Sequence, residues 1–576
     1  MAHEPTIKWV EWTDETFQRA KIENKPILLD ISAVWCHWCH RLDHDTYSVP
    51  EIAEYIESHF VTIRVDTDKR PDINRRYNMG GWPTTAFLTP DGLVIGGGTY
   101  FPPDQMRQIL RDVYSIWEKT KGQPTSKIVL PEPESIPIGD ISISIVDEVL
   151  GEVANNFDSI YGGFGSQPKF PSTDAHELAL LKYHDTRNRE ILKIATLTLH
   201  NVGKGGLFDS EMGGFFRYST VRDWSIPHYE KMSEDNAKWL SLYLHAYQAT
   251  GEQFYIDIAR GIIEYVLAWL SDQEKGCFYG SQDADEEYYK LTKKERLKMT
   301  PPYVDKHIYT NWNALMISSL FEASLVLRDA PIRDFATKSL HRLMALNYND
   351  GKGMYHFYDG EPHLLNQLAD QMQTTRTLCH AYELTGEEEF IRRAEELMQT
   401  AADKLYDKEH GGFFDTAVDP NAPGFLSKPA KPLDENSVAA RALIKLHYLT
   451  GKESYRKMAE GTLNRFVEIF PQFGFMAADY ALAVDAFLNE PTIFRIIGSP
   501  EKAQTKDLLN EAHRIYDPRK IVQVLNPDRD AQYITELGYP RADQPTAFVC
   551  LGKLCTAPIT EARHIASELA KLNRAE

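Results

Sequence analysis

Two cysteines separated by two residues are the clearest chemical signal in this 576-residue sequence. Cys36 and Cys39 follow the apolar stretch 26–32, which predicts a buried strand, and they stand where that strand should pass into a helix. Unpaired backbone N–H groups at a helix start favour a thiolate, so Cys36 is the expected nucleophile and Cys39 the expected resolving thiol. The spacing predicts thiol–disulfide exchange.

Three other interpretations of this stretch are open. Cys36-x-x-Cys39-His40 also spells the attachment motif of c-type haem, although that chemistry belongs to exported proteins and the motif here lies at a strand-to-helix junction. The two cysteines with His37 and His40 could hold a metal, but four ligands on one helical turn surround an ion poorly. The cysteines could also belong to a redox-type fold that does not use them. We expect no metal and no cofactor.

A helical repeat fills the middle of the chain. A tyrosine followed by Thr-Gly marks the end of a predicted helix in three segments, 247–251, 382–386 and 448–451. After each segment the pattern predicts a second helix and then a stretch of aromatic residues and glycine. Twelve such helical stretches make six hairpins, which can bury their apolar faces by closing into a ring. The repeat predicts an (α/α)6 toroid.

Polar residues at the starts of the inner helices are a second candidate site. Inner helices of such a ring run the same way, so their N-termini and the loops that return to them should line one cup. Aromatic faces with carboxylates and amides suit a sugar, paired carboxylates suit glycoside cleavage, and a His acid–base pair suits epimerisation. Ordinary N-caps, or a buried polar network that stabilises the ring, would explain the same residues. The candidate substrate-binding residues are His228, Glu230, Asp235, Asn236, Asp283, Asp285, Trp312, Asn313, Asp370, Glu435, Asn436 and Asp479.

The elements that must position these residues divide the chain into several units. Before the repeat, strands and helices alternate and two late strands pair. After it, short strands and helices alternate again. The predicted fold class is multi-domain: an α/β unit at 1–122, a proline-rich linker at 123–140, the all-α toroid at 141–490, and a small α/β segment at 491–576.

Composition limits the classes of function. The sequence has 63 basic and 83 acidic residues, and its net charge of -20 repels nucleic acid and anionic membranes. It has no apolar run of about 18 residues and no signal-peptide pattern at its start. We therefore expect a cytoplasmic protein that binds neither nucleic acid nor membranes. Cys277 and Cys379 are expected to pack as small apolar residues.

The N-terminal unit resembles thioredoxin. Asp30 stands six residues before Cys36, Trp35 precedes that cysteine, and Trp82-Pro83-Thr84 resembles the cis-proline loop of the family. The resemblance implies that Asp30 takes a proton from Cys39 and that Pro83 orients the partner's backbone. His37-Trp38 replaces the family's Gly-Pro, and an imidazole beside the thiol should make the pair more oxidising.

The whole chain resembles a family of uncharacterised thioredoxin-domain proteins of the spermatogenesis-associated type. The matching motifs run in order between residues 30 and 440 and include 36–40, 80–83, 228–232 and 281–285. The toroid resembles six-hairpin glycosidases and the N-acylglucosamine 2-epimerase group. Cys550 and Cys555 resemble the family's terminal cysteine pair and, as buried cysteines, need have no redox role. The insert after Asp285 is shorter than in the family, so part of the cup rim should be missing.

Three functions follow from these patterns. The first is thiol–disulfide exchange with a disulfide-bearing protein or a reductase. The second is a carbohydrate-active enzyme, of glycoside hydrolase or sugar epimerase type, in which the thioredoxin unit is a platform. The third is a non-catalytic scaffold that binds another protein through the acidic mouth.

Overall fold

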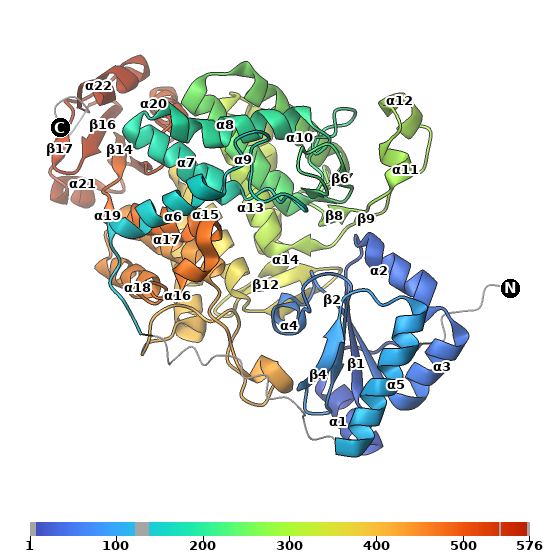
Figure 1. Ribbon diagram of the computed structural model, residues 1–576. Coiled ribbons are helices and arrows are strands. Elements are labelled where there is room, and N and C mark those ends of the chain that lie inside the picture. The colour runs from blue at the N-terminus through green and yellow to red at the C-terminus, as the bar shows by residue number, and fades with distance from the viewer. Residues whose placement is uncertain (1–6, 121–136, 541–542, 573–576) are drawn as a thin grey trace.

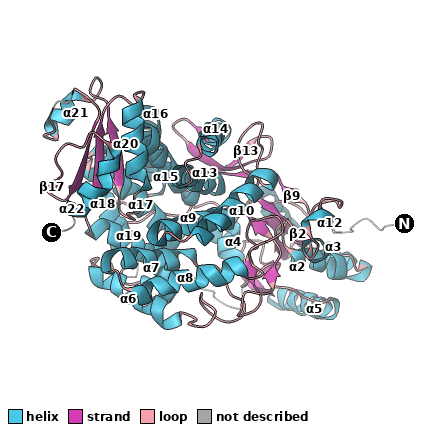
Figure 2. Cartoon of the chain, turned by 90° about the horizontal axis from the view of Figure 1, so that it is seen from above, coloured by secondary structure: helices cyan, strands magenta, loops and turns pink. Residues whose placement is uncertain are grey.

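The computed structural model describes residues 7–120, 137–540 and 543–572 (Figure 1). Its helices and strands form three units, with the toroid between the N-terminal unit and the C-terminal unit (Figure 2). Most of the predicted linker lies outside the described residues.

The N-terminal unit has a four-stranded sheet of order β2-β1-β3-β4. Strand β1 pairs parallel to β2 and antiparallel to β3. The strands are β1 (Ile27–Ser32), β2 (Val61–Asp66), β3 (Thr84–Leu88) and β4 (Val94–Gly98), and the helices are α1 (Asp14–Glu23), α2 (His37–Leu42), α3 (Pro50–His59), α4 (Pro71–Tyr77) and α5 (Pro103–Thr120). A π-helical turn, η1 (Asp43–Tyr47), continues α2. The predicted strands and the closing helix are confirmed.

The toroid contains twelve long helices within the described residues, arranged as six hairpins. Each inner helix packs against the next, and α19 closes the ring on α7. The inner helices are α7 (Thr173–Thr186), α9 (Ser233–Thr250), α13 (Thr310–Val326), α15 (Leu368–Thr385), α17 (Leu433–Thr450) and α19 (Ala478–Leu488). The outer helices are α6 (Ile143–Asn156), α8 (Arg189–Lys204), α10 (Gln253–Trp269), α14 (Ala330–Asn347), α16 (Glu388–Leu405) and α18 (Glu453–Asn464). The ring confirms the predicted (α/α)6 architecture.

Glycine turns after the outer helices are tied to the inner helices by buried amides. Asn236 accepts a hydrogen bond from the N–H of Phe215 at 2.8 Å and donates to its carbonyl at 3.1 Å. Asn313 and Asn436 hold Phe278 and Phe413 in the same way. Since these backbone groups are buried, the amides supply partners that would otherwise be missing.

Buried lysines tie down the same turns. Lys231 donates to Asp209 Oδ2 at 2.6 Å and to the carbonyl of Gly213 at 2.8 Å. Gly213 has φ +81°, and a Cβ there would lie 2.1 Å from a backbone oxygen of Gly261, so the turn requires glycine. Lys431 repeats the arrangement at another turn. The motif around Lys231 therefore stabilises the ring.

The C-terminal unit repeats the topology of the N-terminal sheet. Its strand order is β15-β14-β16-β17, and β14 pairs parallel to β15 and antiparallel to β16, as β1 does with β2 and β3. Pro545 precedes β16 as Pro83 precedes β3. The segment after β14 has no cysteine. The elements are β14 (Thr492–Ile497), α20 (Ala503–Arg514), β15 (Ile521–Leu525), α21 (Ala531–Glu536), β16 (Thr546–Leu551), β17 (Leu554–Cys555) and α22 (Ile565–Leu572).

Candidate functional site

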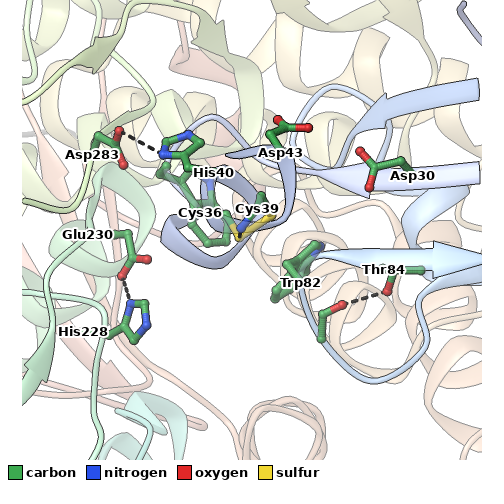
Figure 3. Close-up of a disulfide and its surroundings, with 12 residues drawn as sticks. Asp30, Cys36, Cys39, His40, Asp43, Trp82, Thr84, His228, Glu230 and Asp283 are labelled. Carbon is green, nitrogen blue, oxygen red and sulfur yellow. Dashed lines mark hydrogen bonds and ion pairs between the residues drawn. A yellow bond between two sulfur atoms is a disulfide. The ribbon is translucent and has the colours of Figure 1, made fainter. Parts of the chain in front are cut away.

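The dithiol lies at the start of α2. Cys36 is the N-cap residue, and its Sγ accepts a hydrogen bond from the N–H of Cys39 at 3.2 Å. The two cysteines form a disulfide. The Trp82–Pro83 peptide bond is cis, as the sequence predicted, and the rings of Trp82 and Trp35 lie 5.7 Å apart. The chain thus brings a disulfide-bonded cysteine pair and a cis-proline loop together (Figure 3).

Toroid residues cover this dithiol. Cys36 and Cys39 are 4% and 3% exposed, and their apolar cluster includes four toroid side chains, which are Met232, Tyr309, Trp312 and Phe357. Arg217 of the toroid lies over the rings of Trp35 and Trp82, at 4.1 and 5.1 Å. A partner that approaches Cys36 from this side must therefore pass the toroid.

A buried ion pair holds the N-terminal unit on the toroid. Arg76 on α4 donates to both carboxylate oxygens of Asp415, at 2.7 and 3.0 Å, and the two side chains are 3% and 4% exposed. Beside it, Tyr77 stacks on Phe425 with ring centroids 5.5 Å apart and accepts a hydrogen bond from the Phe425 N–H. The two units share one packed interface.

Asp30 is buried in β1 and has a cationic partner. Arg64 Nε donates to Asp30 Oδ2 at 2.7 Å and also pairs with Asp43, while Tyr47 OH is 3.5 Å from the other Asp30 oxygen. Burial raises the pKa of Asp30 to about 6, although Arg64 opposes the shift. In Figure 3, Asp30 and the toroid carboxylates lie on opposite sides of the dithiol.

Two histidine–carboxylate pairs flank the dithiol on the toroid side (Figure 3). His40 Nδ1 lies 3.8 Å from Asp283 Oδ2, and burial raises the pKa of Asp283 to about 6. His228 Nδ1 donates to Glu230 Oε2 at 2.5 Å, and Glu230 is 1% exposed. The structure places three predicted cup residues, Asp283, His228 and Glu230, beside the dithiol, and none of the three lines the cavities described below.

Asp68 is a site residue that the sequence did not single out. It accepts a hydrogen bond at 2.6 Å from Nε1 of Trp35, the residue that precedes Cys36. Desolvation and the nearby Asp66 raise the pKa of Asp68 well above its ordinary value. Its position just after the carboxyl end of β2 is the signal that could have revealed it.

A cavity of about 280 Å³ lies between the N-terminal unit and the toroid mouth. Of the predicted cup residues, it brings together Asp235, Trp312 and Glu435. Burial raises the pKa of Asp235 to about 6, and Arg75 pairs with Glu435. Both units line this space, so a ligand here would contact residues of the thioredoxin-like unit as well as the cup.

Five predicted cup residues have structural roles. The amides of Asn236, Asn313 and Asn436 are occupied by backbone groups of the glycine turns and of the helix starts. Asp285 caps the short helix α11 (Glu286–Tyr289). Asp370 is 0% exposed and bonds the Asn311 N–H at 3.0 Å and His356 at 2.9 Å. Polar atoms of these five residues thus have partners inside the fold, and their assignment to a substrate site stays a prediction.

A larger cavity of about 890 Å³, here called the chamber, runs down the inner helices. Asp479 lines it and pairs with Arg441 at 2.6 Å. The chamber and the mouth cavity share Arg75 and Glu435, and Tyr516 and Lys520 of the C-terminal unit line its other end. The inner helices thus enclose a polar space between the two α/β units.

The other cysteines differ in exposure. Cys277 and Cys379 are buried and unpaired with each other, as expected. Cys550 and Cys555 form a disulfide across β16 and β17, and Cys555 is exposed, which corrects the expectation of a buried pair.

In the portion of the chain that the structure describes, no helix has the length and apolar character to cross a membrane.

Comparison with known proteins finds relatives of the whole chain and of its N-terminal unit. A family model described as Thioredox_DsbH, protein of unknown function, DUF255, matches residues 1–128. Spermatogenesis-associated protein 20 of Homo sapiens is 26% identical over 96% of this chain and 88% of its own length. Thioredoxin of Alicyclobacillus acidocaldarius is 30% identical over 18% of this chain and 93% of its own length. Cellobiose 2-epimerase from Spirochaeta thermophila has a TM-score of 0.48 and 14% identity over 60% of this chain and 97% of that structure.

Over nearly its whole length the chain is therefore similar to spermatogenesis-associated protein 20, and its N-terminal residues match the DUF255 family model.

Proposed function

We propose that this protein carries out thiol–disulfide exchange at a dithiol that the toroid mouth encloses. The observation that carries the proposal is the position of Cys36, which caps α2, bonds Cys39 and lies beside the cis-Pro83 loop. Helix-start N–H groups stabilise a thiolate there, and a second thiol within bonding distance can displace a bound partner.

The exchange transfers two electrons from the reduced dithiol to the partner disulfide. The Cys36 thiolate attacks one sulfur of a partner disulfide, forms a mixed disulfide and releases the other sulfur as a thiolate. Cys39, once deprotonated, attacks the Cys36 sulfur and releases the second partner thiolate, leaving the Cys36–Cys39 disulfide. An external dithiol or a reductase must then reduce this disulfide.

Because the toroid covers the dithiol, the size of a disulfide should determine how fast it reacts with Cys36. A small disulfide needs only a path past the toroid side chains that cover Cys36. A disulfide-bearing protein or a reductase needs the N-terminal unit to separate from the mouth, against the Arg76–Asp415 ion pair. We therefore propose that small disulfides react faster with the closed protein.

Cys36→Ser is expected to lower the rate of disulfide reduction by about 1,000-fold or more, since a hydroxyl is not ionised at neutral pH and cannot replace the thiolate. The measurement is reduction of bis(2-hydroxyethyl) disulfide and of insulin, with dithiothreitol as the reductant. Cys277→Ser, a buried toroid cysteine, is the matched control and should keep the wild-type rate. Equal rates in Cys36→Ser and wild type would refute exchange at this site.

The resolving step is expected to accelerate as the pH rises through about 6. Asp30, whose pKa is raised to about 6, can take the Cys39 proton only when it is ionised, which is the form above that value. The measurement is the single-turnover decay of a Cys36 mixed disulfide between pH 5 and 8. Asp30→Asn should remove the inflection near pH 6, while Asp43→Asn, which loses a different partner of Arg64, should keep it. Persistence of the inflection in Asp30→Asn would exclude the proton relay.

A second candidate function is a carbohydrate-active site in the mouth cavity. Asp235, with its raised pKa, is suited to act as an acid, and Glu435 beside Arg75 supplies a second carboxylate. Trp312 offers an apolar face in the same cavity. Calorimetric titration with a panel of neutral sugars should show saturable binding that Asp235→Asn weakens by about tenfold. Absence of heat for every sugar contradicts it, and a pull-down would then test the protein-binding scaffold.

A further inference from the structure

Among the described residues that line the chamber, Arg376 is an arginine without an ion-pair partner. Arg376 on α15 lines the chamber, and within the described parts of the chain it has no hydrogen bond and no ion pair within 4 Å. Every other cationic side chain that lines the chamber has such a partner. The carboxylate-paired cations are Arg75, Lys238, Arg441, Lys445, Arg519 and His245, and Lys520 donates to backbone carbonyls.

The acids nearest to Arg376 are mostly committed elsewhere. Asp479 pairs with Arg441, and Glu322 accepts a hydrogen bond from Ser241 at 2.7 Å and faces His245. These two acids and Asp174 attract Arg376 only from beyond ion-pair distance, while Arg441 repels it. Desolvation lowers the pKa of Arg376 to about 10, so it carries a full charge at neutral pH.

Asp174 is an unpaired acid on the opposite wall of the chamber. It lies on α7, which is three places from α15 in the six-membered ring of inner helices, and it lines the chamber. It too lacks a hydrogen bond and an ion pair within the described residues. Burial and the nearby Asp479 raise its pKa to about 6. An unpaired cation and an unpaired carboxylate therefore face one space.

Uncharged polar groups line the same chamber as Arg376. His380 follows it by one turn of α15, lines the chamber, and bonds Ser318 through Nδ1 at 2.9 Å. Its Nε2 has no partner among the described residues. Desolvation lowers the pKa of His380 well below its usual value, so the ring is neutral. Ser241 and Ser318 add hydroxyl groups to the chamber wall.

Unpaired charges inside an enclosed space cost free energy that a complementary ligand would offset. Arginine suits a carboxylate because its planar group can donate two parallel hydrogen bonds to it. Carboxylates, hydroxyls and a neutral imidazole suit the hydroxyl groups of a ligand. We infer that the chamber binds a small polyhydroxylated carboxylic acid, of the sugar-acid class, with its carboxylate on Arg376 and its hydroxyl groups toward Asp174 and His380.

This inference is independent of the dithiol, and it concerns a site deeper than the carboxylates of the mouth cavity. A chamber of about 890 Å³ has the size of a small-molecule site. The ligand class follows from the charges that lack partners, so a neutral sugar should bind more weakly than its acid.

The test is isothermal titration calorimetry with D-gluconate, D-glucuronate and D-glucose. At least one acid should bind the wild type, and Arg376→Gln should weaken that binding about tenfold or more. Arg392→Gln, an exposed arginine on the outer helix α16, is the matched control and should bind like wild type. Asp174→Asn should also weaken binding, which keeps the test valid if Arg376→Gln does not fold. Cys36→Ser should bind normally, so that a failure of thiol chemistry is distinguishable.

Three results would overturn the inference. The first is that neither acid binds, and the second is that Arg376→Gln, with a wild-type circular dichroism spectrum, binds as tightly as wild type. The third is that glucose binds as tightly as the acids, because the affinity would then not depend on a carboxylate bound to Arg376.

Discussion

Arg76→Ala should raise the rate at which a bulky maleimide labels reduced Cys36 by about 100-fold or more. Arg76 binds both oxygens of Asp415 and also donates to the carbonyls of Phe425 and Lys428, all across the interface between the two units. Its removal leaves a buried carboxylate without its main partner, at a cost of about 3–5 kcal/mol, and each 1.4 kcal/mol is about a factor of ten in the population of the open form.

Labelling is followed by mass spectrometry of the peptide that contains Cys36, under reducing conditions. Arg107→Ala is the control, because the ion pairs of Arg107 with described residues are solvent-exposed and lie within the N-terminal unit, and its loss should change the rate less than about twofold. If Arg76→Ala is folded and labels at the wild-type rate, the toroid does not control access to the dithiol.

Asp209→Asn is expected to lower the free energy of unfolding of the toroid by about 3–5 kcal/mol. Lys231 Nζ and Arg296 Nη1 both lie 2.6 Å from Asp209 Oδ2, and all three side chains are 2% exposed or less. The substitution leaves two buried cations side by side with no counter-charge. Urea unfolding at pH 7, followed by circular dichroism, measures the loss.

The effect should depend on pH in a defined direction. The pKa of Asp209 is lowered in the folded protein, since Lys231 and Arg296 outweigh its desolvation. Its stabilisation is therefore complete above the unfolded value of about 3.9 and is lost as the pH falls through the folded value, so wild type and variant converge in acid. Asp147→Asn should cost less than about 1 kcal/mol, because the Asp147 side chain is exposed and its contact with Lys182 is long, at 3.8 Å. Equal urea midpoints for Asp209→Asn and wild type would show that the triad does not stabilise the ring.

The hairpins of the toroid were predictable because their signals are local. Glycines such as Gly251 and Gly386 adopt the left-handed conformation that ends a helix, and the next helix starts within a few residues. The dithiol was predictable for the same reason, since Cys36 caps a helix that follows a buried strand. The residues that start, end and cap a helix lie within a short segment of the sequence, so a local pattern is enough to predict them.

The roles of polar residues at the helix starts were not predictable in this way. Asn236 and Asp235 are neighbours, yet the amide turns to the glycine segment and the carboxyl group reaches the mouth cavity. The direction in which each side chain points depends on which backbone groups of a distant turn need hydrogen-bond partners. The enclosure of Cys36 by Trp312 and Phe357 is likewise a contact between segments far apart in the chain, and no local pattern specifies it.

The repeated topology of the C-terminal unit escaped prediction for a related reason. Its strands were visible, but the pairing order of β14, β15 and β16 is a tertiary property, and the loop after β14 has no cysteine pair like that of the N-terminal unit. The N-terminal unit lies at one end of the chamber and the C-terminal unit at the other, and their sheets have the same strand order.

The most direct test of the account is to trap the mixed disulfide. Cys39→Ser, reduced and then exposed to glutathione disulfide, should form one glutathione adduct at Cys36, located by peptide mass spectrometry, and the adduct should persist because the resolving thiol is gone. In the Cys36→Ser, Cys39→Ser double variant the same peptide should stay unmodified. An unmodified Cys36 in folded Cys39→Ser, with glutathione found only on Cys550 or Cys555, would contradict thiol–disulfide exchange at the toroid mouth.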